Sequence, residues 1–459
     1  MGKVVLIKPR KKCEIADLLP SNIGRASMVH SLIESFEELY SEIDIKVADL
    51  ADISDLKTYH NSSYIDYLMQ RGSSDDKEFE DKEDMDEFYG LQYDCYPFDQ
   101  MTEYVQETCG GTLSAVSELL KNRESSKNKH KKLRLNVELN QKSNNTSNSD
   151  SRSEFEKAYS EKTVVAIHWE GGRHHGHKSN ASGFCYINDI VIGILKIQKS
   201  LEYMPKIMYI DLDLHHGNGV QNAFFYSNNV LSLSIHHFDH ETRFFPFSGG
   251  EILGNDSESK LAKNGMTLNV PLKKGLNDEN FIYIFDEIVV KIVSEFNPEY
   301  IVVQCGCDGL AGDPANIWNL TIVSYLHAIR KLLEYTVSND NNLSKNSPDN
   351  QNEKIRKSAD NNSDKKRLLV LGGGGYNNTN VARCWTAITL YLTKYFNSGE
   401  FMSFEEVVDT LVPDHEFIEN YSPYYDLSIE ANHLQKDENT REYLDFVIEK
   451  VQSVWCKST

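Results

Sequence analysis

Apolar residues in this chain form short runs of strand length that alternate with longer segments of helical periodicity. The run at 206–210 is apolar after its first residue and has strand composition, whereas 25–40 repeats apolar residues every three or four positions, as a helix does. The predicted strands are 4–7, 163–167, 206–210, 230–235, 266–272, 300–304 and 367–371, and the predicted helices are 25–40, 102–121, 186–199, 277–296, 320–337 and 381–396. This alternation predicts one α/β domain over residues 1–459, with a mainly parallel sheet and helices on both faces.

Two segments interrupt this pattern. Residues 123–152 and 338–366 are rich in Ser, Asn and Lys, and hold too little apolar surface to offset the entropy of ordering. We therefore expect them to be disordered insertions. The basic stretch 127–134 within the first has two readings, a nuclear-import signal or a solvated loop.

The composition and net charge of the chain exclude some classes of protein and favour others. The chain has 459 residues, of which 40% are apolar, and its formal net charge is −21. Such a charge argues against direct binding of nucleic acid and favours cationic partners. The sequence shows no membrane span and no signal peptide at its start. Its eight cysteines are dispersed, which favours reduced thiols in an intracellular compartment.

The stretch 211–219, which follows the strand at 206–210, carries the strongest chemical signal. It reads Asp-Leu-Asp-Leu-His-His-Gly-Asn-Gly. Alternate side chains of an extended segment share a face, so Asp211, Asp213 and His215 point the same way. Two carboxylates and an imidazole on one face are suitable ligands for a divalent cation. The alternative is a structural Asp–His hydrogen bond in the protein core.

Three further clusters also follow predicted strands. Glycines and histidines at 171–177 follow the strand at 163–167, residues 305–309 follow the strand at 300–304, and residues 372–377 follow the strand at 367–371. Nine of the fifteen histidines lie between His168 and His240. In open parallel sheets ligands bind at the carboxyl ends of the strands, so we expect one polar site at that edge.

A catalytic zinc ion takes about three protein ligands and keeps one position open. Asp213 and His215 supply two, and Asp308 is the best-placed third; this oxygen-rich set also suits Fe²⁺. His174 and His175 are candidates for general base and acid. Asp211 and Asn218 are the natural acceptors for their second ring N–H.

The glycine run 372–375 and Tyr376 allow more than one reading. A phosphate loop is disfavoured because no Lys-Ser or Lys-Thr follows the glycines. Bare backbone instead allows substrate to approach closely, with the Tyr376 hydroxyl supporting a developing oxyanion. The remaining alternative is a tyrosine that only packs.

These motifs together resemble the class I zinc-dependent lysine deacetylases, which hydrolyse acetyl groups from protein lysines, histone tails included. The resemblance rests on 25–33, 93–95, 173–177, 182–189, 211–219, 311–314 and 372–377, in family order along nearly the whole chain. It implies an arginase/deacetylase-like fold, an enzyme of nucleus and cytoplasm, and roles in chromatin regulation and transcription repression. The chain ends soon after Trp455, which resembles the member that works without a corepressor complex.

The resemblance also implies a role for each matching residue. Asp213, His215 and Asp308 would hold Zn²⁺, His175 would be general base and acid beside His174, and Tyr376 would polarise the amide carbonyl. The substrate would contact Asp94, Gly183, Phe184, Phe245 and Gly374. Structural K⁺ would bind at Asp211, Asp213, His215, Ser234 and Ile235, and at a second site at Phe224 and Val230. Arg25 and Cys185 would lie at the cavity through which acetate leaves.

Two residues depart from the family pattern. Asn218 stands where class I members usually carry Asp, and Ala315 stands where a larger apolar residue usually shapes the tunnel rim. Besides protein deacetylation, two functions stay open. One is deacetylation of small acetylated amines such as polyamines, against which a peptide-binding Asp94 argues. The other is an acetyl-lysine-binding scaffold without turnover, against which an intact ligand set and Tyr376 argue.

Overall fold

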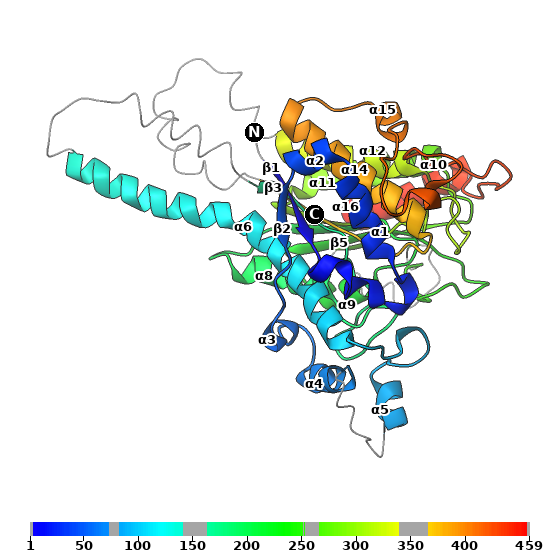
Figure 1. Ribbon diagram of the computed structural model, residues 1–459, viewed down its shortest axis with the longest axis horizontal. Helices are drawn as coiled ribbons and strands as arrows, with labels where there is room; N and C mark the ends of the chain where they lie inside the picture. The colour runs from blue at the N-terminus through cyan, green and yellow to red at the C-terminus, as the bar shows by residue number, and fades with distance from the viewer. Residues whose placement is uncertain are drawn as a thin grey trace.

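Eight parallel strands form a single sheet in the computed structural model, which describes residues 3–72, 82–140, 163–250, 252, 266–338 and 366–456 (Figure 1). The strand order is β2-β1-β3-β8-β7-β4-β5-β6, and every pair is parallel. The strands are β1 Lys3–Lys8, β2 Asp44–Val47, β3 Thr163–His168, β4 Ile207–Asp211, β5 Val230–His237, β6 Thr267–Leu272, β7 Tyr300–Gln304 and β8 Arg367–Leu371.

Helices cover both faces of the sheet, because each strand sends alternate apolar side chains to opposite sides. In β1, Val4 and Leu6 join the larger core cluster, while Val5 and Ile7 join the opposite one. The larger cluster lies under α1 Arg25–Ser35, α2 Glu37–Glu42, α10 Asp278–Ile284, α11 Lys291–Phe296, α12 Ile322–Ser338, α14 Asn378–Ser398, α15 Phe404–Val408 and α16 Arg441–Cys456. The opposite cluster lies under α6 Met101–Asn140, α8 Asp189–Lys199 and α9 Asn218–Phe224. The predicted fold class, a mainly parallel α/β sheet with helices on both faces, is confirmed.

Several predicted boundaries shift. The helix predicted at 25–40 is interrupted at Phe36, whose ψ of 80° is not helical, and the helix at 277–296 contains a π-helical segment, Phe285–Val290, between α10 and α11. Strand β2 was not predicted, because in this edge strand Asp44 and Lys46 carry charge and only two residues are apolar. Short helices α3 Ile53–Leu56, α4 Ser62–Arg71 and α5 Lys82–Phe88 surround the connection that leads to α6.

Helix α6 overlaps the first predicted insertion, and disorder over 123–152 stays a prediction. Helix α6 continues to Asn140, past residue 123, where composition predicted disorder. The sequence there contains Lys, Arg, Glu and Leu, all good helix formers, and neither Pro nor Gly, so helical backbone can propagate. The predictions for 141–152 and for 339–365 lie outside the described residues.

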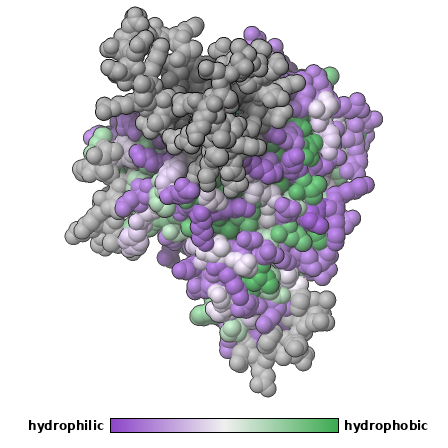
Figure 2. Space-filling model, turned by 90° about the vertical axis from the view of Figure 1, so that its left-hand side faces the viewer, coloured by the Kyte–Doolittle hydropathy of each residue, from purple (hydrophilic) through white to green (hydrophobic). Residues whose placement is uncertain are grey.

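The middle of the sheet positions the candidate site. Strands β3, β8, β7 and β4 are neighbours, and the four clusters of polar residues follow them directly. Because the strands are parallel, all four clusters meet at one edge of the sheet. The described part of the face drawn in Figure 2 is largely hydrophilic, with small hydrophobic patches between hydrophilic residues. Among the described helices, none is long and apolar enough to cross a membrane.

Candidate active site

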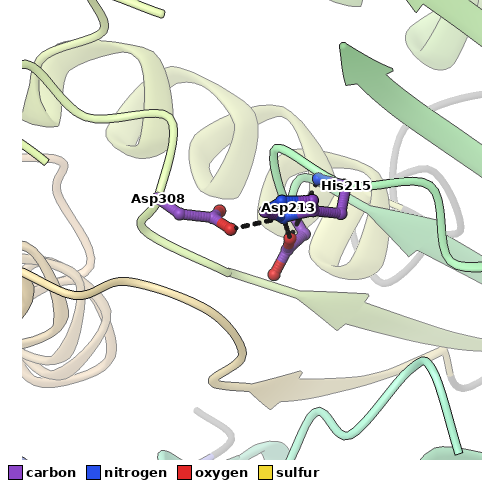
Figure 3. Close-up of side chains that lie close together, drawn as sticks. All are labelled: Asp213, His215 and Asp308. Atoms are coloured by element: carbon purple, nitrogen blue, oxygen red, sulfur yellow. Dashed lines mark hydrogen bonds and ion pairs between the residues drawn. The ribbon is translucent and has the colours of Figure 1, made fainter. Parts of the chain in front are cut away.

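Three potential metal ligands converge where β4 and β7 end (Figure 3). Asp213 and His215 come from the loop after β4, and Asp308 comes from the loop after β7. His215 Nδ1 lies 2.8 Å from Asp308 Oδ2 and 3.3 Å from Asp213 Oδ1. One ligand atom from each residue lies within 4.8 Å of the other two. The structure therefore brings together the three residues predicted as ligands.

Hydrogen bonds from neighbouring residues hold the two carboxylates, and two of these neighbours, Gln304 and Leu214, were not predicted as site residues. Gln304 Nε2 donates to Asp213 Oδ2 over 2.8 Å, and the Gly374 N–H donates to the same oxygen over 2.9 Å. The Leu214 N–H donates to Asp308 Oδ1 over 2.9 Å. A buried polar residue at the end of the apolar run 300–304 was the available signal for Gln304. These bonds orient the carboxylates and leave Asp308 Oδ2 directed at His215.

Glycine is required at position 374 by close packing. A Cβ built there would lie 2.6 Å from Asp308 Oδ2 and 2.9 Å from Asp213 Oδ2. Both separations are shorter than van der Waals contact, so a side chain would displace the ligand carboxylates. The glycine run thus serves first to let the loop after β8 reach the carboxylates.

Burial makes the charges of these three residues interdependent. Burial and the nearby Asp213 raise the pKa of Asp308 to about 7. Burial alone would raise the pKa of Asp213 too, but His174 and His215 hold it well below its usual range. Burial would lower the pKa of His215, but hydrogen bonds to Asp213 and Asp308 raise it to about 10. Two buried carboxylates thus share the His215 imidazole and lie close to each other, and such a concentration of negative charge favours a bound cation.

Two histidine dyads lie beside the three ligands. His174 Nδ1 lies 2.8 Å from Asp211 Oδ2, and His175 Nδ1 lies 2.9 Å from Asn218 Oδ1. The two imidazole rings are 3.9 Å apart between centroids. The structure thus forms both contacts expected from the sequence. Tyr209, which the sequence did not single out, donates from its hydroxyl to Asp211 over 2.7 Å.

The neighbouring residues shift the pKa values of His174 and His175 in opposite directions. Burial would lower the pKa of His174, but Asp211 and Asp213 raise it to about 8. Burial, His174 and His215 together hold the pKa of His175 well below its usual range, because Asn218 supplies no negative charge to oppose them. His175 is therefore neutral near pH 7 and able to accept a proton.

A cavity of about 200 Å³ opens onto the two histidines of the dyads and onto Asp213 and His215. Phe245 packs edge-on against His175 at 4.9 Å between ring centroids, and Phe184 packs edge-on against Tyr376 at 5.7 Å. A Cβ at Gly183 would lie 2.4 Å from the His175 ring, so only glycine allows the backbone to pack this closely against His175. The predicted substrate residues Asp94, Gly183, Phe184, Phe245 and Gly374 all line the cavity.

Asp94 and Tyr376 also line the cavity, each held by backbone contacts. Asp94 Oδ2 accepts the Gly183 N–H over 3.0 Å, so it braces the tunnel wall from the connection between α5 and α6. The Tyr376 N–H donates to Asp313 Oδ2 over 2.8 Å. Ala315 donates its N–H to Asp313 Oδ1 over 2.9 Å, and its side chain packs against the larger core cluster.

The inner end of the cavity contains residues that the sequence reading had not assigned. Cys185 lines it, as expected, together with Asn22 and Arg173. A small adjoining hollow holds Arg25, and Asn22 and Arg173 line this hollow as well. Arg173 belongs to the motif 173–177, for which the sequence predicted roles only at His174 and His175. Its signal would have been a lone arginine beside two histidines at a strand end.

The predicted potassium residues are close to one another in the first site. Asp211 and Ser234 are paired across β4 and β5, and Ile235 follows Ser234. Ser234 Oγ lies 2.9 Å from His236 Nδ1 and 3.4 Å from the Gly217 nitrogen. Phe224 ends α9, Val230 begins β5, and both are buried. Binding of potassium at either place stays a prediction.

Comparison with known proteins places the chain in a family. Residues 19–344 match the histone deacetylase domain. Histone deacetylase 8 of Xenopus tropicalis is 30% identical over 453 residues, which cover 98% of this chain and 96% of that protein. Histone deacetylase 8 of Danio rerio is also 30% identical, with 98% and 94% covered. Histone deacetylase RPD3 of Saccharomyces cerevisiae is 29% identical over 97% of this chain and 84% of that protein.

The chain belongs to the histone deacetylase family, and its reaction class is that of a hydrolase that deacetylates protein lysines. Within the family it is a class I enzyme similar to histone deacetylase 8.

Proposed function

We propose that this enzyme hydrolyses Nε-acetyl-lysine side chains of histones and other proteins in a metal-dependent reaction. The observation that carries the proposal is the convergence of Asp213, His215 and Asp308 beside two histidine dyads at the base of an aromatic-walled cavity. The family assignment supports lysine deacetylation, and the cavity supports the roles of the individual residues.

The donor set fits a catalytic zinc site, with Fe²⁺ as an alternative. It offers one imidazole nitrogen and two carboxylates, and it contains no thiolate. A cation held by these three residues would lower the pKa of a water and polarise the substrate carbonyl. We further propose structural K⁺ at Asp211 and Ser234, and a second site at Phe224 and Val230.

The chain's own residues would then move the protons. His175 is neutral, and its Nδ1–H donates to Asn218, so its Nε2 carries the lone pair that accepts a proton from the attacking water. The same imidazole then returns a proton to the departing lysine nitrogen. His174, held protonated by Asp211, supplies positive charge beside the reacting centre. The Tyr376 hydroxyl donates to the carbonyl oxygen as negative charge develops there.

The cavity wall would select the lysine stem. Phe184 and Phe245 supply apolar surface for the four methylenes, and Gly183 keeps the passage narrow. Arg25 and Cys185 would lie where acetate leaves. Asp94 would hold the peptide backbone at the entrance, which favours peptides over acetylated polyamines.

Partners and location follow from the same proposal. Acetylated, lysine-rich tails suit a chain with a formal charge of −21, and the relatives named histone deacetylase favour the nucleus. Presence in the cytoplasm and activity without a corepressor complex are part of the proposal.

The proposal is tested by turnover of an acetyl-lysine peptide and of an acetylpolyamine by the purified full chain. We expect peptide turnover that a chelator abolishes and zinc restores. Faster turnover of the acetylpolyamine would favour the small-amine alternative, and absence of turnover in zinc-loaded protein would favour a binding scaffold.

A further inference from the structure

Two guanidinium groups are buried together behind the candidate active site. Arg25 begins α1 and Arg173 follows β3, and their exposed fractions are only 4% and 6%. They face the same small hollow, which Asn22 and Trp385 also line. Burial and the like charge of Arg173 together lower the pKa of Arg25 to about 10. The two cations therefore repel each other electrostatically.

Neither guanidinium forms an ion pair with a carboxylate among the described residues. Arg25 Nη1 donates to the Gly375 carbonyl over 2.9 Å, and its guanidinium lies 4.8 Å from the Trp385 ring. Arg173 Nη2 donates to the Glu170 carbonyl over 3.0 Å, and Arg173 Nε is buried without a hydrogen-bond partner.

The nearby carboxylates are engaged elsewhere. The Glu170 carboxylate lies 2.8 Å from His30 Nε2. The Asp189 carboxylate accepts the backbone N–H of Arg173 over 2.8 Å, and it also accepts the Thr112 hydroxyl over 2.6 Å. A buried cation normally has an anionic partner, because desolvation without one is costly. Among the described residues no carboxylate pairs with either guanidinium, so both are suited to bind an anionic group of a ligand.

The position of the two guanidiniums connects them to the reacting centre. Arg173 and Asn22 line both the inner hollow and the main cavity, where Cys185, His175 and Tyr376 also lie. If the lysine stem enters past Asp94, as the proposed function has it, the far side of the scissile carbonyl would face Arg173 across the cavity that both residues line. That is the direction in which the acyl chain of a bound substrate extends.

We propose that Arg173 recognises acyl groups that end in a carboxylate, so that the enzyme removes malonyl or succinyl groups from lysine in addition to acetyl. This proposal rests on the proposed function, because it places a second substrate class in the same site. The reaction is hydrolysis: a water oxygen bonds to the acyl carbon, the C–N bond breaks, and the lysine nitrogen takes a proton. The products are lysine and a dicarboxylate, and no oxidant or other co-reactant is consumed.

The test compares peptides that differ only in the acyl group. Succinyl-lysine and butyryl-lysine both carry four acyl carbons, but only succinyl ends in a charge, so their ratio separates charge from size. We expect the full-length enzyme to have a higher kcat/KM for succinyl-lysine than for butyryl-lysine. We expect Arg173→Met to lower that ratio about ten- to a hundredfold, as for loss of a charge-assisted hydrogen bond, and Arg173→Lys to lower it less.

A matched control uses another buried arginine. Arg383 donates to the carbonyls of Tyr421, Tyr424 and Asp426, away from the cavity, so Arg383→Met should leave the succinyl-to-butyryl ratio unchanged. Circular dichroism confirms that each variant is folded. A wild-type ratio at or below one, or an equal ratio in wild type and Arg173→Met, overturns the proposal. In the second case the arginine would serve only the fold or the product acetate.

Binding gives a readout that does not depend on turnover. Calorimetry on the purified full chain should show tighter binding of succinate than of butyrate, and Arg173→Met should remove the difference. Equal binding of the two acids by the wild type would contradict the proposal. Failure of the proposed function would look different: acetyl-lysine peptides would not be hydrolysed at all, whatever the outcome with succinate.

Discussion

At the scale of single residues, the two histidine dyads differ by one charge. Asp211 is an anion beside His174, whereas Asn218 offers His175 only a neutral oxygen. The pKa of His174 is consequently raised to about 8, and that of His175 is held well below its usual range. Under the proposed mechanism, this difference would separate a histidine that carries positive charge from one that accepts a proton.

Asn218→Asp should therefore shift the pH profile. An anion beside His175 stabilises the imidazolium and raises its pKa, so the base becomes protonated at a higher pH. Under the proposed mechanism, activity on the acidic side needs neutral His175, so the acidic limb of kcat/KM should move upward in pH. Steady-state kinetics across pH 4–8 measures the shift. An unmoved limb, or one displaced downward, would mean that another group controls it.

Asp308→Asn should remove the metal without unfolding the chain. The amide keeps the size of the side chain but replaces an anionic ligand with a neutral one, and it also relieves repulsion from Asp213. We expect loss of activity together with a lower zinc content in the folded variant, measured by elemental analysis. Full zinc occupancy would show that Asp308 is not a ligand.

Tyr376→Phe should lower kcat by roughly 10²–10³, the usual effect of deleting one oxyanion donor. The phenyl ring retains the packing against Phe184, so substrate should still bind. Separate determination of kcat and KM distinguishes a loss of catalysis from a loss of binding. A kcat equal to that of the wild type would leave Tyr376 as a packing residue.

At the scale of elements, the sheet was predictable because its strands are short, apolar and followed by unusual polar clusters. Asp213, His215 and Asp308 could be grouped from that pattern alone, since parallel strands bring their carboxyl ends together. Gln304 and Arg173 could not be assigned, because their roles depend on which side chain faces which cavity. The division of 277–296 by a π-helical segment also leaves no sign in the apolar periodicity.

The connection between α5 and α6 can be tested apart from the chemistry. Asp94→Ala removes a proposed acceptor for substrate backbone N–H groups, so KM for peptides should rise. A charge-assisted bond contributes about 1.5–3 kcal/mol, which corresponds to a loss of about ten- to a hundredfold in peptide kcat/KM. A small acetylated amine without a peptide backbone should be much less affected.

Asp99 provides the control for this prediction, because it lies exposed on the same connection. Asp99→Ala removes the same charge and should change neither substrate's kinetics appreciably. Equal losses on both substrates with Asp94→Ala would mean that the residue acts by bracing Gly183, whose N–H it accepts.

At the scale of the whole molecule, charge and cavity favour the same kind of substrate. The formal charge of −21 would attract cationic peptides, and the cavity of about 200 Å³ would, under the proposed function, take the acyl-lysine side chain. Long-range attraction depends on ionic strength, whereas the fit of the side chain inside the cavity does not. Salt can therefore separate the two contributions.

Binding of basic peptides should accordingly weaken as salt increases. The Debye length falls from about 10 Å at 0.1 M salt to about 3 Å at 1 M, which screens the field outside the cavity. We expect kcat/KM for an acetyl-lysine peptide flanked by Lys and Arg to fall on the order of tenfold over that range. The same acetyl-lysine flanked by Gly and Ser should change far less, because it carries no charge for the field to attract. Parallel salt titrations of the two peptides measure the difference. Identical salt dependence for both would show that the charge does not steer substrates and that recognition is confined to the cavity and its rim.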